Sequence, residues 1–156
     1  MITTADHLSG LLADLDDANC ECNGLTRLAT TTLHWHQIPH TVFKGEVRRK
    51  RTDGGPDLVV APHYWARVGD LVIDYRARMW LGTDVDVPHG VFMAAEFPAV
   101  EYAGVEVDLM PLPATLFRFV FNNDGLDFEK LMPGLSAASN TEHGAAGSDG
   151  YWFDRP

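Results

Sequence analysis

The chain has 156 residues, 46% hydrophobic and 22% charged, which is typical of one globular domain with a sizeable core. Its formal net charge of −10 argues against a nucleic-acid or anionic-membrane binder, because phosphate affinity requires clustered cations. No stretch approaches the ~20 apolar residues of a membrane-spanning helix, and the start, MITTADHLSG, lacks the features of a secretory signal.

The two cysteines, Cys20 and Cys22, are separated by one residue, so a disulfide between them would close a very small, strained loop. Free thiols in a reducing compartment are the better interpretation. We therefore expect a cytoplasmic protein, with export by a route that needs no signal left open. The sequence indicates no cofactor, and it does not predict an oligomeric state.

Helices are predicted in the N-terminal third. Residues 5–15 carry leucines at spacings of three and four, which indicates a short amphipathic helix. A second helix is predicted to end before Pro39, with one face formed by Leu25, Leu28, Ala29, Thr32 and His36. If Asn19 caps this second helix, Cys22 lies in its first turn, where the helix dipole favours a thiolate.

Strands are predicted over most of the remaining chain. They cover residues 40–47, 57–61, 90–95, 100–109 and 115–121, and the two arms of HYWARVGDLVID, residues 63–74. The basic run RRKR (48–51) is interpreted as a solvated loop rather than an anion-binding patch. Helices followed by strands indicate one α+β domain over residues 1–133 with a mostly antiparallel sheet, and residues 134–156 are predicted to be a flexible tail.

The stretch HYWARVGDLVID is predicted to be a hairpin that turns at Gly69–Asp70. Side chains alternate across a strand, so one face should form core: Tyr64, Ala66, Val68, Leu71, Ile73 and Tyr75. The other face should carry His63, Trp65, Arg67, Val72, Asp74 and Arg76. His63 and Asp74 are then diagonal neighbours at roughly 7–8 Å, within reach of each other's side chains.

An imidazole oriented by a carboxylate is what a general base requires, although an exposed polar face would also contain both residues. Cys22 shares a helical face with Leu25 and Ala29 and is expected to point inward, whereas Cys20 lies about 200° away around a helix. The alternative for Cys22 is a buried structural thiol. Together, the three residues predict a nucleophile, a base and its orienting group.

The ordered set resembles the transglutaminase-like branch of the papain-like cysteine enzymes. In that family a cysteine opens a buried helix, GIP follows, a strand runs to a glycine, and "H-aromatic-W" and "hydrophobic-hydrophobic-D" supply the other residues. This chain has CNGLTRLATTTLHWHQIPHTVFKGEV and then HYWARVGDLVID, within residues 19–76. The resemblance implies a papain-like fold, with Cys22 as nucleophile, His63 as general base and Asp74 as its orienter, and Trp65 fits a wall of the site.

Two shorter segments add to the resemblance. CNGL is similar to the CSGL nucleophile segment of NlpC-type cell-wall endopeptidases, and DYRARMW is similar to the D-x-T-A-R-Q segment of papain-fold glutamine-deamidase toxins. The chain departs from these patterns with Gln37 in place of a glycine and Arg76 in place of a threonine. The backbone N–H of Cys22 and the side chain of Asn19 are the candidate oxyanion donors.

We therefore expect a cysteine-nucleophile amide hydrolase or acyl transferase that acts on a peptide or protein amide. The alternatives are a protein glutamine deamidase or transglutaminase, and a non-catalytic adaptor domain that retains the fold. A metal site is not predicted, because His34 and His36 diverge on a helix and His40 lies beyond the proline.

Overall fold

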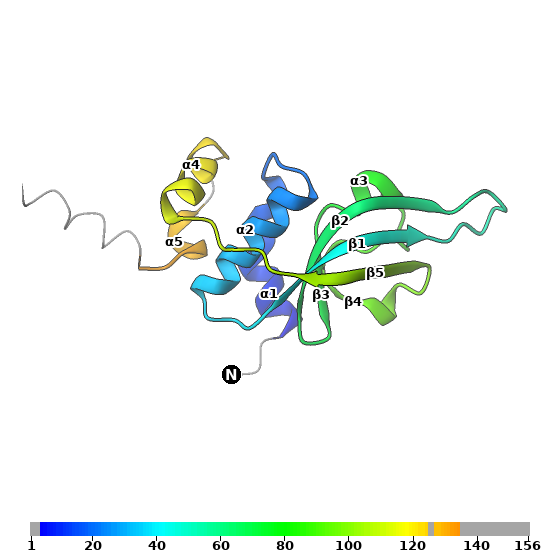
Figure 1. The fold of residues 1–156 in the computed structure, drawn as a ribbon, viewed down its shortest axis with the longest axis horizontal. Helices are drawn as coiled ribbons and strands as arrows, with labels where there is room; N and C mark the ends of the chain where they lie inside the picture. The colour runs from blue at the N-terminus through cyan, green and yellow to red at the C-terminus, as the bar shows by residue number, and fades with distance from the viewer. Residues whose placement is uncertain (1–3, 125–126, 135–156) are drawn as a thin grey trace, which may run out of the picture.

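Five antiparallel strands form one sheet with the order β4-β3-β2-β1-β5 (Figure 1). The computed structural model describes residues 4–124 and 127–134. The strands are β1 (Thr41–Arg49), β2 (Leu58–Val68), β3 (Leu71–Asp74), β4 (Gly90–Met93) and β5 (Val100–Val107). The predicted α+β class is confirmed, while the predicted tail, 134–156, lies outside the described residues except for Gly134.

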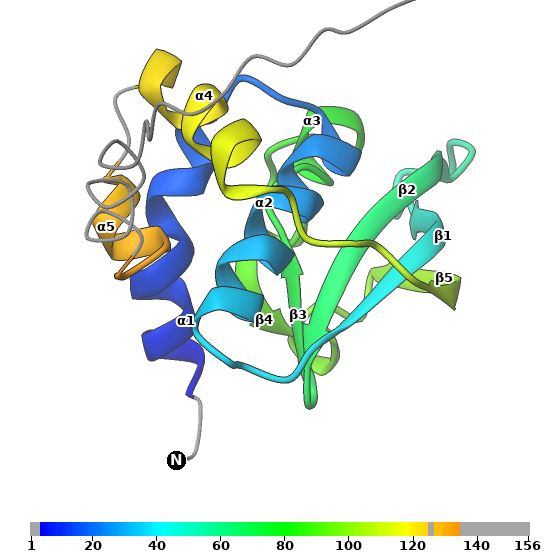
Figure 2. The same ribbon diagram turned by 60° about the vertical axis from the view of Figure 1, so that its left-hand side comes forward.

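Helices α1 (Ala5–Leu12) and α2 (Cys22–Trp35) lie on one side of this sheet (Figures 1 and 2). The 3₁₀ helix η1 (Ala13–Asp17) connects them, and α4 (Ala114–Asp124) and α5 (Phe128–Leu131) lie farther from the sheet. The short helices α3 (Arg78–Leu81) and η2 (Ala94–Glu96) connect strands. Among the described residues, no helix combines the length and apolarity needed to span a membrane.

Helix α1 forms where the leucine spacing predicts it. The Thr4 hydroxyl caps it by accepting a hydrogen bond from the His7 N–H at 3.2 Å. Leu8, Leu12 and Leu15 are fully buried, and burial of such a side chain contributes about 1.5–3 kcal/mol. This apolar face packs with α2 and with Ala66 of the sheet to form the first core.

Helix α2 ends in a Schellman motif. The Gln37 N–H donates to the His34 carbonyl and the Ile38 N–H donates to the Leu33 carbonyl. Gln37 adopts the left-handed conformation, with φ of 55°. This backbone requirement explains why a glycine suits the position, and Gln37 meets it at a steric cost of about 1–2 kcal/mol.

The hairpin has the predicted register. Ala66 pairs with Ile73 and Val68 pairs with Leu71, and Gly69 has the positive φ of 57° that the turn needs. The second face is not exposed: a second core covers it, formed by Val47, Trp65, Val72, Ala77, Leu81, Val87, Phe92 and Val100. Side chains on both faces of the hairpin are therefore buried.

Strand β2 is one continuous strand where the sequence predicts two. Gly45 pairs with His63, but Val47 pairs with Val60, so β2 contains one extra residue between these pairs. Such a bulge bends its strand and re-aims the neighbouring side chains. The bulge directly precedes His63.

Two predictions are wrong, one for residues 115–121 and one for the basic run, residues 48–51. Residues 115–121, predicted to form a strand, lie within α4, since Pro113 precedes the helix and Phe117 is buried in the first core. A short apolar run does not by itself distinguish strand from helix. In the basic run, Arg48 and Arg49 lie in β1 rather than in a loop.

The basic residues of the run are paired with carboxylates. Arg48 contacts Glu46, and Arg49 contacts Asp84 and Asp86, each nearest contact at 2.7 Å. Further pairs join Arg48 to Asp57, Lys50 to Glu101 and Arg51 to Asp53. These neighbours neutralise the cations locally, which disfavours an anion-binding role.

Candidate active site

Cys22 is the first residue of α2, as the sequence predicts. The cap, however, is Glu21 and not Asn19, because the first helical hydrogen bond runs from the Leu25 N–H to the Glu21 carbonyl. Asn19 is exposed and lies in the segment between η1 and α2. The Glu21 side chain makes no capping hydrogen bond to α2, and the backbone of Asn23 hydrogen-bonds the Cys22 side chain.

His63 and Asp74 meet in the interior of the domain. The His63 Nε2–H donates to Asp74 Oδ2 at 2.7 Å, and the side chains are 0% and 2% exposed. His63 follows the β2 bulge, and Asp74 is the last residue of β3. The two predicted residues are therefore hydrogen-bonded out of contact with water.

Asp74 accepts four hydrogen bonds. Its Oδ1 accepts from the backbone N–H groups of Arg76 and Ala77 at 2.8 and 3.0 Å. Its Oδ2 accepts from His63 and from the hydroxyl of Tyr102, the latter at 3.0 Å. These donors satisfy the carboxylate and hold it in one orientation.

Tyr102 is a residue that sequence reasoning missed. It lies on β5, which pairs with β1, so no local pattern relates it to Asp74. Burial, together with the charge of Asp74, raises the pKa of the Tyr102 hydroxyl far above its usual range. The raised pKa favours the protonated hydroxyl, the form that donates to Asp74.

Cys22 contacts the imidazole of His63. The His63 Nδ1 is buried and makes no hydrogen bond of full geometry to a described residue. Contact with His63 nevertheless lowers the pKa of the Cys22 thiol, against the opposing effect of burial, and the backbones of Tyr64 and Asn23 lower it further. Such contacts are often long or poorly aligned before substrate binds.

The same interactions change the basicity of His63. Burial alone lowers the pKa of the imidazole, but hydrogen bonding to Asp74 and to Cys22 outweighs burial and raises the pKa to about 9. A lowered thiol pKa beside a raised imidazole pKa favours a thiolate–imidazolium pair near neutral pH.

Trp65 packs against the imidazole from the interior of the domain and does not line an accessible surface of the site. It is 1% exposed, and its ring centroid lies 6.3 Å from His63 and 5.8 Å from Phe43, in stacked arrangements. A Cβ at Gly104 would lie 2.6 Å from the Trp65 ring, so a glycine leaves the space that the indole occupies. Trp65 thus fixes the imidazole from the protein side.

Cys20 faces away from this group. It precedes α2 and lines a separate pocket of about 160 Å³ with Leu28, Leu112 and Leu116. Cys20 and Cys22 are not joined by a disulfide. The choice of Cys22 as the candidate nucleophile is consistent with this arrangement.

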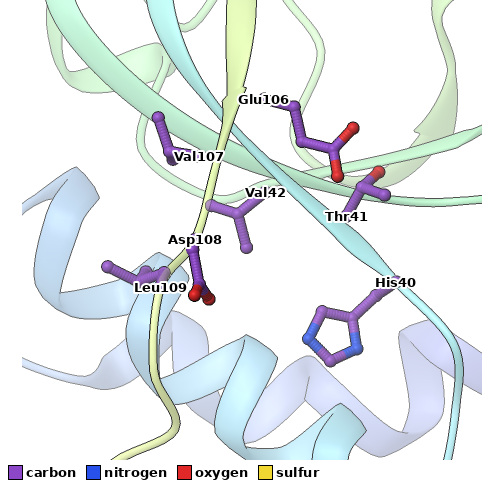
Figure 3. Close-up of a pocket in the computed structure, with 7 residues that line it drawn as sticks. All are labelled: His40, Thr41, Val42, Glu106, Val107, Asp108 and Leu109. Carbon is purple, nitrogen blue, oxygen red and sulfur yellow. The ribbon is translucent and has the colours of Figure 1, made fainter.

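A larger pocket of about 430 Å³ lies between the start of β1 and the end of β5 (Figure 3). The side chains of His40 and Asp108 border it from the two strands' ends, together with Thr41, Val42, Glu106, Val107 and Leu109. Val42 is three residues from Gly45, the partner of His63, which corresponds to about 10 Å along a strand. None of the residues that line this pocket is Cys22, His63 or Asp74.

The predicted helix-end histidines contact backbone carbonyls. His36 Nε2 lies 3.0 Å from the Lys130 carbonyl, and His40 Nδ1 lies 2.9 Å from the Ile38 carbonyl. Within residues 4–124 and 127–134, no group of three His, Cys, Asp or Glu side chains is arranged to hold a metal ion. His89 Nε2 lies 2.8 Å from Asp16 Oδ2.

Comparisons with protein-family models, with curated proteins and with solved structures find no match to this chain. The function must therefore be argued from the geometry and chemistry of the site itself.

Proposed function

We propose that this protein is a cysteine-dependent amide hydrolase or acyl transferase of the kind its sequence resembles, the transglutaminase-like and papain-like enzymes. Cys22 is the nucleophile, His63 is the general acid and base, and Asp74 orients His63. One observation carries the proposal: a buried imidazole donates one N–H to a carboxylate and also contacts a thiol, and that contact lowers the pKa of the thiol.

In the first half of the reaction, the Cys22 thiolate attacks the amide carbonyl carbon and forms a C–S bond. The carbonyl oxygen becomes an oxyanion, and the backbone N–H of Cys22, the first residue of α2, donates a hydrogen bond to it. The His63 imidazolium gives its Nδ1 proton to the departing amine as the C–N bond breaks.

In the second half, neutral His63 takes a proton from water or from a second amine. The activated oxygen or nitrogen attacks the thioester carbon, the C–S bond breaks, and the Cys22 thiolate and the imidazolium are restored. Asp74 keeps its four hydrogen bonds throughout, so it stabilises the imidazolium without accepting its proton.

A second candidate is deamidation or transamidation of a glutamine side chain. It is favoured by burial: His63 has 0% exposure and Cys22 is only partly exposed. A side-chain amide can extend into such a recessed site more readily than an internal peptide bond. The two candidates share every catalytic step and differ in the substrate and in the group that resolves the thioester.

Incubation of the protein with a denatured, glutamine-containing protein, with and without a biotinylated primary amine, tests the proposal. Mass spectrometry would detect backbone cleavage, conversion of glutamine to glutamate, or incorporation of the amine. Each expected change should disappear in Cys22→Ala and in His63→Ala, and persist in Cys20→Ala. If wild type and Cys22→Ala give the same products across a panel of amide substrates, the non-catalytic adaptor is the better description.

A further inference from the structure

Arg76 is buried, and its guanidinium uses all five of its N–H groups. They donate at 2.7–3.0 Å to the carboxylate and carbonyl of Asp16 and to the carbonyls of Ala18, Cys20 and Tyr75. Four of these five bonds reach the segment 16–20, which immediately precedes the Cys22 helix.

The backbone of the same residue holds the other half of the site. The Arg76 N–H donates to Asp74 Oδ1 at 2.8 Å. Arg76 thus connects the carboxylate that orients His63 to the segment that leads into Cys22. The N-cap residue of α2, Glu21, makes no side-chain capping hydrogen bond.

We propose that Arg76 is a positioning residue, which sets the placement of Cys22 relative to His63 by fastening the segment 16–20 to the end of β3. The inference rests on the proposed function for its catalytic meaning. Arg76 acts through the position of the segment. The fork geometry of its guanidinium matters as well as its charge, because its five hydrogen bonds reach five different oxygens.

Alkylation of Cys22 by iodoacetamide, followed across pH by peptide mass, tests this inference without any substrate. In Arg76→Met, the apparent pKa of Cys22 should rise towards the ordinary ~8.5, and a rise of one unit lowers the alkylation rate at pH 6 about tenfold. Arg76→Lys should behave like Arg76→Met, since an ammonium has three donors on one atom and cannot bridge the same oxygens.

Arg78→Met is the matched control. Arg78 lies two residues away, and its guanidinium donates to the Val87 carbonyl at 2.8 and 3.0 Å, away from the segment 16–20. This variant should retain the wild-type alkylation profile of Cys22. An unchanged Cys22 profile in folded Arg76→Met would overturn the inference, and a wild-type profile in Arg76→Lys would replace positioning with a simple charge effect.

Arg76→Met leaves buried carbonyls without donors, so circular dichroism must first show that it folds. If it does not fold, the same alkylation experiment is made with Asp16→Ala. The Asp16 side chain is 41% exposed and contributes one of the five acceptors of Arg76. A partial rise in the Cys22 pKa would support the inference, and no rise would overturn it. If wild type turns over an amide but Arg76→Met leaves the Cys22 alkylation profile unchanged, this inference alone is wrong. If Arg76→Met changes that profile but wild type turns over no amide, the proposed function alone is wrong.

Discussion

His63 and Asp74 form a 2.7 Å hydrogen-bonded pair whose side chains are almost completely shielded from water. An isolated charge at this depth would be very costly, so the pair and its further donors depend on one another. This mutual dependence gives the site its expected sensitivity to substitution and to pH.

Asp74→Ala should destabilise the domain by about 3–5 kcal/mol, because it removes the acceptor of four buried hydrogen bonds. Urea unfolding at pH 7 measures this change. Glu101→Ala, which removes a carboxylate paired with Lys50 at an exposed site, should cost less than about 1 kcal/mol. Equal effects of the two substitutions would contradict a buried, interdependent site.

His63→Ala should return the pKa of Cys22 towards the ordinary ~8.5. Contact with His63 is the largest cause of the lowered thiol pKa. When this contact is removed, burial, which raises the thiol pKa, has a larger net effect. The pH dependence of Cys22 alkylation in wild type and His63→Ala measures the change, with Cys20 in the same samples as an internal reference. A Cys22 profile that is indifferent to His63 would exclude a thiolate–imidazolium pair.

The stability of the domain should fall in alkaline solution because of His63. Its folded-state pKa is about 9, above the ~6.5 of an unfolded histidine, so the folded state binds the proton more tightly. The contribution is fully present below pH ~6.5 and is lost as pH rises through 9, amounting to at most about 3 kcal/mol. Urea unfolding of the wild-type protein across this pH range measures the effect, and His63→Gln should remove the pH dependence.

Tyr102→Phe should destabilise the domain by about 1.5–3 kcal/mol, since the carboxylate of Asp74 loses a buried donor. With one fewer donor, Asp74 should attract the His63 proton more strongly, so an NMR titration should show a further rise in the pKa of His63. The matched control is Tyr64→Phe, because the Tyr64 hydroxyl makes no hydrogen bond to a described residue in the structure, and this variant should leave the titration unchanged.

Gln37→Gly should stabilise the domain by about 0.5–1 kcal/mol. It relieves the left-handed backbone at φ of 55°, partly offset by the greater flexibility of glycine in the unfolded chain. Gln37→Ala is the control, because it keeps a Cβ and should give no gain. Thermal unfolding of both variants distinguishes conformational strain from any contact of the glutamine side chain.

Local patterns were sufficient for several parts of this protein. The leucine spacing placed α1, Gly69–Asp70 set the hairpin register, and a helix began at Cys22, because each feature depends on residues close together in the chain. The same local rules erred at the cap, which is Glu21 rather than Asn19, and at α4, where a short apolar run suits two kinds of structure.

The sequence alone thus selected Cys22, His63 and Asp74 as candidates and predicted the hairpin that brings the last two together. Only the tertiary structure decided that both faces of this hairpin are buried, and that Tyr102 and Arg76 hold the carboxylate. The Tyr102 bond joins residues 28 positions apart in the chain, and the Arg76 bond to Ala18 joins residues 58 apart. Such contacts depend on how the sheet and helices pack, and no periodicity or turn signal within one element encodes them.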